Sequence, residues 1–179
     1  MKPNIEELAI VERKRETGYF CKVSRILRST DLKRLNAKKS VFMERVRRDL
    51  EAFENELAKS GDARITCLDG LSTAYTWCLN ELVDNAILHA HGNDPTKPVT
   101  VNYFRTDREV VATVEDEGPG FNFKPRPITE RITPEEIIRT GIKHQRKLGL
   151  KGVQRYMNNI EYDRYTRRIT VKKALSRDK

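Results

Sequence analysis

The stretch from Cys78 to His91, with the sequence CLNELVDNAILHAH, constrains the fold more than any other part of the chain. Its apolar residues recur at helical spacing, which predicts an amphipathic helix with one face in a core. Glu81 and Asn85 are four positions apart, so they lie one above the other on the flank of that face, about 40° apart around the axis. A carboxylate there could accept a proton, and an amide oxygen one turn later could bind Mg²⁺. Such a pair is also common on solvated helices, so its interpretation depends on the rest of the chain.

Two glycine-bearing stretches provide that context. In VEDEGPGF (114–121) an apolar run leads into a turn, where Gly118 and Gly120 allow close backbone approach to a flat ligand and Asp116 can accept a hydrogen bond from an exocyclic amine. In KLGLKGV (147–153) the glycines open a helical pattern, and a helix N-terminus can bind phosphate. Either stretch alone predicts an ordinary turn. Three elements in this order, with a basic segment between the last two, indicate more than ordinary turns.

With these elements the chain resembles the GHKL ATPase superfamily, which includes DNA gyrase and the sensor histidine kinases. Its nucleotide pocket is built from an N box (here ELVDNA), a G1 box (DEGPG) and a G2 box (KLGLKGV). Within it, the chain is most similar to the bacterial anti-sigma-factor serine kinases. Glu81 stands where histidine kinases usually carry Asn, and NAILHAH, DEGPGF and a final helix ending in IEY fit that branch. The resemblance covers roughly residues 19–174.

The resemblance implies ATP and Mg²⁺ as cofactors and a role for each site residue. Glu81 would be the general base acting on a substrate serine, and Asn85 would hold the Mg²⁺ that bridges the phosphates. The remaining residues would hold the nucleotide: Asp116, Gly118 and Gly120 at the adenine, and Arg146, Lys147 and Gly149 at the phosphates. The resemblance also implies homodimers and two protein partners, a sigma factor and an anti-anti-sigma phosphoacceptor.

The expected fold is a two-layer α/β sandwich of the Bergerat type, with a mixed, mostly antiparallel sheet and three main helices over one face. Residues 1–17 would form an arm or a short helix, and residues 18–179 one ATP-binding domain. Asp69 is the expected N-cap of the N-box helix, and Asp31 is one of three candidate caps for the helix before it. Strands are expected at 19–27, 99–104, 109–116 and 169–175, and helices at 37–59, 69–92 and 149–162.

Residues 121–146 form a long connection broken by prolines, with a short helix expected at 132–142. Between Phe123 and Lys151 there are eight Lys or Arg against three Glu. This segment is either a solvated loop or the ATP lid of the family, a flap whose cations meet phosphates. Long loops in compact domains are usually functional, which favours the lid.

Two departures from the family pattern leave an alternative open. Lys147 stands where relatives usually begin the G2 box with Gly, and neither Thr166 nor Thr170 is in register with the Gly-Thr pair that precedes their last strand. The alternative is a protein-binding module that uses the nucleotide, or even an empty, degenerate pocket, as a conformational switch without phosphotransfer. A detached histidine-kinase domain ranks below it, because all three histidines fall at or after the N box.

Composition places limits on the other functions. The net charge of +9 would suit an acidic partner, a nucleotide or nucleic acid, but direct nucleic-acid binding rests on charge alone and ranks last. The cysteines (Cys21, Cys67, Cys78) are widely spaced, which predicts reduced thiols in a cytoplasm and no zinc. His89 and His91 would point apart on a helix, so structural roles are expected for them. No apolar run has the length of a membrane span.

Overall fold

The computed structural model describes residues 21–62, 68–123, 128, 130–143 and 149–175. Its sheet has five strands in the order β1-β2-β3-β5-β4, and every neighbouring pair is antiparallel. The expected sandwich is therefore confirmed, with a described sheet that contains no parallel pair. The strands are β1 (Cys21–Leu27), β2 (Val99–Arg105), β3 (Glu109–Glu115), β4 (Asn159–Asp163) and β5 (Arg168–Ala174).

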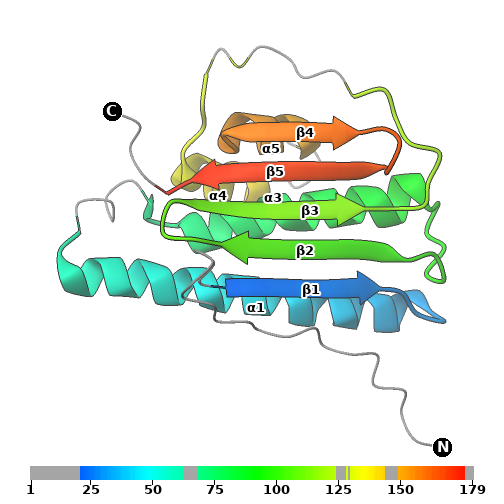
Figure 1. Ribbon diagram of the computed structural model, residues 1–179, viewed down its shortest axis with the longest axis horizontal. Coiled ribbons are helices and arrows are strands. Elements are labelled where there is room, and N and C mark those ends of the chain that lie inside the picture. The colour runs from blue at the N-terminus through cyan, green and yellow to red at the C-terminus, as the bar shows by residue number, and fades with distance from the viewer. Residues whose placement is uncertain (1–20, 63–67, 124–127, 129, 144–148, 176–179) are drawn as a thin grey trace, which may run out of the picture.

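The described helices lie on one face of this sheet and leave its other face uncovered in the view of Figure 1. In the described part of the chain, none of them is both long enough and apolar enough to cross a membrane. The helices are α1 (Leu32–Ser60), α3 (Leu71–Asn85), α4 (Pro134–Lys143), α5 (Gly149–Tyr156) and a π-helical turn, η2 (Ala86–Ala90), that continues α3.

The core forms where alternate residues of the strands meet the apolar stripes of the helices. On β2 the inward positions Val99, Val101 and Tyr103 are fully buried, while the positions between them are half-buried. Phe42 and Leu50 of α1 are also fully buried, and each such side chain contributes about 1.5–3 kcal/mol of burial free energy. This layer holds α3 rigidly against the sheet.

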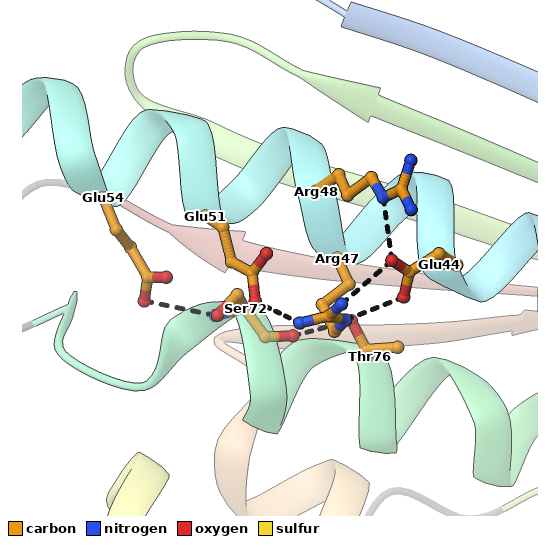
Figure 2. A network of polar contacts seen from close by, with 7 residues as sticks. All are labelled: Glu44, Arg47, Arg48, Glu51, Glu54, Ser72 and Thr76. Carbon is orange, nitrogen blue, oxygen red and sulfur yellow. Dashed lines mark hydrogen bonds and ion pairs between the residues drawn. The ribbon is translucent and has the colours of Figure 1, made fainter.

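The two long helices begin in different ways. Asp31 caps α1 as expected, because its Oδ1 accepts the Arg34 N–H at 2.8 Å. The prediction that Asp69 caps α3 is wrong. Gly70, with φ of 75°, occupies the cap position and offers no side chain, and Glu54 of α1 instead accepts the Ser72 N–H at 3.2 Å (Figure 2). One helix thus supplies the cap of the next.

Arg47 and Arg48 of α1 pair with acids of the same helix, as Figure 2 shows. Arg47 hydrogen bonds Glu44 at 2.9 Å and also contacts Glu51, and Arg48 reaches Glu44 at 2.8 Å. The hydrogen bonds from Arg47 and Arg48 lower the pKa of Glu44 to about 2. The positive charges of Arg47 and Arg48 are therefore largely matched within the helix.

The last helix ends earlier than the sequence predicts. α5 stops at Tyr156, and the residues NIEYD, which were expected to end this helix, form β4. Ile160 is buried opposite Val171 of β5, and the Asn158 N–H donates to the Lys172 carbonyl at 2.8 Å. Pairing with β5 therefore overrides the helical pattern, and the prediction that the last helix reaches residue 162 is wrong.

Candidate functional site

A pocket of about 320 Å³ lies between the end of α3, the π-helical turn η2 and the turn that follows β3. Most of its wall is apolar, with a few polar groups among the apolar ones, which is the usual composition of a small-molecule site. Of the residues predicted from sequence, Asn85, Asp116 and Gly120 line it.

Of the other predicted site residues, Glu81, Gly118 and Gly149 are described and are not among the residues that line this pocket. Gly149 is not in its wall, but the next residue, Leu150, is. Glu81 lies one helical turn before Asn85, and Gly118 lies behind the pocket wall. Arg146 and Lys147 lie outside the described residues.

Asp116 is held in place by the turn that it begins. One carboxylate oxygen, Oδ1, accepts the Gly118 N–H at 2.7 Å, and the Asp116 N–H approaches the Arg167 carbonyl at 3.4 Å. Among the described residues, the other oxygen, Oδ2, has no hydrogen-bond partner. A half-buried carboxylate that lines a pocket in this way can accept a hydrogen bond from an amine of a bound ligand.

Glycine is favoured at two positions of this turn, 118 and 120, for different structural reasons. Gly120 has φ of 75°, a left-handed conformation that favours glycine, and faces the Tyr162 hydroxyl. A Cβ on Gly118 would lie 2.5 Å from the Ala90 Cβ and 2.8 Å from the Ala90 carbonyl oxygen. Glycine at position 118 therefore lets the turn pack directly against η2, a reason that the sequence did not indicate.

The family model of the histidine kinase-like ATPase domain matches residues 40–173. The chain belongs to this family. No curated protein matches the chain at a significant level. The matched range spans all the residues that line the pocket, and membership of this family implies that the domain binds ATP.

An aromatic wall closes one side of the pocket of this ATPase domain. The rings of Phe121 and Tyr162 lie 4.4 Å apart between centroids, and Phe123 packs edge-on against both. The Phe121 N–H also donates to the Tyr162 hydroxyl at 3.3 Å. Sequence reasoning missed Tyr162, because it assigned this residue to the end of a helix rather than to β4.

Glu81 sits in an environment that makes it a better proton acceptor. Burial is the main cause that raises the pKa of its carboxyl, and the neighbouring Asp84 raises it further, while Lys39 opposes both. Asp84 is itself held by Lys39 of α1, with Nζ 2.6 Å from its Oδ1, and by Asn80 at 2.8 Å. Nothing in the sequence pairs Lys39 with Asp84, since 45 residues separate them.

His89 and His91 lie in different surroundings. His89 lines the pocket, whereas His91 is buried and accepts the Glu117 N–H at Nε2, at 3.0 Å. Among the described residues, no group of three or more His, Cys, Asp and Glu side chains could hold a metal ion.

The threonines near the last strand lie away from the pocket. Ile169 lines the pocket at the start of β5, and Thr170, the next residue, points to the other face of the sheet. The Thr166 hydroxyl donates to Asp163 at 2.8 Å within the β4–β5 turn. The hydroxyl that relatives place near the adenine has no counterpart on this wall of the pocket.

About two thirds of the segment predicted as a lid is described, and this part includes α4, which packs against the other helices. Ile137 of α4 is fully buried, and Ile138 and Pro134 lie against Gly70. Arg131 binds carbonyls at the end of α5, including Asn158 at 3.2 Å. The remaining residues of the predicted lid, 124–127, 129 and 144–146, lie outside the described residues.

Proposed function

We propose that this chain is a regulatory protein kinase of the anti-sigma-factor type, which binds Mg-ATP in the pocket and phosphorylates a serine or threonine of a partner protein. The observation that carries the proposal is Glu81. It is a half-buried carboxylate of raised pKa one turn from Asn85, beside the pocket of an ATPase domain. Glu81 is not needed as the ion-pair partner of the nearby Lys39, because Lys39 already pairs with Asp84.

The pocket residues fit an adenine nucleotide. The Oδ2 atom of Asp116 is available to the exocyclic amine, and Phe121 and Tyr162 offer an aromatic surface to the base. The N-terminus of α5, which begins at Gly149 beside the pocket residue Leu150, has no acidic residue in its first turn and would meet the phosphates.

Asn85 is the residue that would hold Mg²⁺. This ion usually takes only one or two protein ligands, with water and substrate phosphates completing its shell, so a single amide oxygen in the pocket wall is sufficient. When bound, Mg²⁺ supplies positive charge that neutralises the phosphates during transfer.

Glu81 would act on the partner protein rather than on the nucleotide. It would take the proton of the substrate hydroxyl as the hydroxyl oxygen attacks the terminal phosphorus and the bond to the departing ADP breaks. Its position outside the pocket wall, on the same helix as Asn85, suits this role, because the attacking hydroxyl must approach the phosphates from outside the nucleotide site.

The partners that we propose are those of the kinase branch: an anti-anti-sigma protein as phosphoacceptor and a sigma factor that the kinase sequesters, with the kinase as a homodimer. The support is the resemblance of the N and G1 boxes to that branch, and a net charge of +9 that suits acidic partners.

A second candidate is a nucleotide-dependent binding switch without phosphotransfer. The specific observation in its favour is that the pocket wall at the start of β5 is the apolar Ile169, while neither Thr166 nor Thr170 lines the pocket. Under this alternative, nucleotide would alter partner binding and Glu81 would have no chemical role.

Phosphate transfer to a purified partner separates the two candidates. Glu81→Gln should keep ATP affinity and lose transfer by about 10²–10⁴-fold, because glutamine is nearly isosteric but cannot take the proton. Asn85→Ala should instead weaken Mg-ATP binding itself. Glu56→Gln, a change at an exposed position of α1, is the matched control. Undiminished transfer by Glu81→Gln would remove the base assignment, and no transfer by the wild type would favour the switch.

A further inference from the structure

His91 joins the end of the N-box helix to the turn that carries Asp116. Its side chain is 5% exposed, and its Nε2 atom accepts the Glu117 N–H at 3.0 Å. Glu117 directly follows Asp116, so this hydrogen bond holds the backbone next to the carboxylate that lines the pocket.

The π-helical turn places His91 for this contact. The His91 N–H donates to the Ala86 carbonyl, five residues earlier, at 3.1 Å, and the Asn93 N–H donates to the Ile87 carbonyl at 3.0 Å. A π-turn contains one residue more than an α-turn and rotates the residues that follow it, a device that is frequent at functional sites. Here the rotation directs the imidazole toward the G1 turn.

The same two elements also touch through Gly118, whose backbone packs against Ala90. Within the described chain, the Gly118 N–H is held by Asp116 itself, so that bond forms inside the turn. Among the described residues, the bond from Glu117 to His91 is therefore the hydrogen bond that fixes the turn to the neighbouring helix, which also lines the pocket.

We infer that His91 is a positioning residue for nucleotide binding: its neutral ring accepts the Glu117 N–H and so fixes the Asp116 carboxylate in the pocket that Asn85 also lines. The inference rests on the proposed ATP site. His91 need not touch the nucleotide. Its contribution is to hold the base-reading carboxylate in place before binding.

Protonation of the ring would remove this support, because a proton on Nε2 would face the Glu117 N–H. Burial is the main cause that lowers the pKa of His91, and Lys97 lowers it further. Asp116, Glu117 and Asp94 face the ring and act in the opposite direction. The ring is therefore neutral at pH 7, and the hydrogen bond should be lost only as the pH falls below about 6.5, the usual His pKa.

The test is the ATP dissociation constant of the wild type, His91→Gln and His91→Leu between pH 5.5 and 8. Glutamine can place an acceptor near the position of Nε2 but does not titrate, whereas leucine has no acceptor. We expect His91→Gln to bind ATP at pH 7.5 as the wild type does, and His91→Leu to bind roughly 3- to 10-fold more weakly. Wild-type affinity should fall toward pH 5.5 by more than that of His91→Gln. Identical pH profiles, or wild-type affinity in His91→Leu, would overturn the inference.

A measurement without nucleotide separates this inference from the proposed function. In ¹⁵N NMR of the free protein, the Glu117 amide should shift with the titration of the His91 ring, and this shift should be absent in His91→Gln. If the wild type binds no ATP but the Glu117 amide follows His91, the proposed function fails and the anchoring of the turn stands. An amide that does not follow the ring would refute the anchoring, even if ATP binds.

Discussion

The two oxygens of the Asp116 carboxylate have separate tasks. Oδ1 closes the turn by accepting the Gly118 N–H, and Oδ2, with no described partner, remains available in the pocket. The residue type could be predicted from the motif, since a carboxylate before two glycines suits a base-reading turn. Which oxygen closes the turn and which faces the pocket could not be predicted, because this depends on the rotamer that the turn imposes on Asp116.

Asp116→Asn tests this division. The asparagine carbonyl can still accept the Gly118 N–H, so the turn and the unfolding temperature should be retained, while its NH₂ group would face the adenine amine with another donor. We expect ATP affinity to fall by roughly 1.5–3 kcal/mol, about 10- to 150-fold, in calorimetric titration. Equal affinities in mutant and wild type would show that Asp116 does not read the base.

At the scale of elements, the site depends on how closely the G1 turn approaches η2. Gly118 packs against the backbone of Ala90, and His91 accepts the N–H of the preceding residue of the turn, Glu117. The helix and the turn therefore form one rigid wall, and side chains at their junction should tolerate little added volume.

Gly118→Ala should lower the free energy of unfolding by about 1–3 kcal/mol, the usual cost of overpacking, and should weaken ATP binding as well. Ala90→Gly in the same chain removes the Cβ at 2.5 Å but leaves the carbonyl oxygen at 2.8 Å, so it should rescue only part of the loss. Urea unfolding of Gly118→Ala and of the double mutant measures these changes in the free energy of unfolding. A single mutant as stable as the wild type would contradict the close approach.

The elements that sequence reasoning predicted correctly are those with local signals. The helical repeat of apolar residues and the Asp31 cap define α1, and alternation defines β2 and β3. The elements and caps that it missed depend on distant partners. β4 exists because Ile160 pairs with Val171, and α3 is capped by Glu54 from another helix.

At the scale of the whole molecule, buried polar contacts bind the sheet to the helices that carry the site. Asp49 of α1 accepts hydrogen bonds from Tyr103 at 2.7 Å and from Arg105 at 2.5 and 2.9 Å, both on β2. This network ties α1 to the sheet, and Lys39 of the same helix holds Asp84 beside Glu81. A pair such as Asp49 and Arg105, 56 residues apart, leaves no periodic signal in a sequence.

The central claim is that the pocket between α3, η2 and the G1 turn binds ATP. A titration of the ¹⁵N-labelled full chain with Mg-ATP, followed by amide shifts, tests it most directly, with Mg-GTP as the control for base recognition. The account predicts saturable shifts concentrated at residues 82–91 and 114–121 and at Leu150, and weaker binding of GTP. Saturable shifts that lie elsewhere, or no shifts at millimolar ATP, would contradict it.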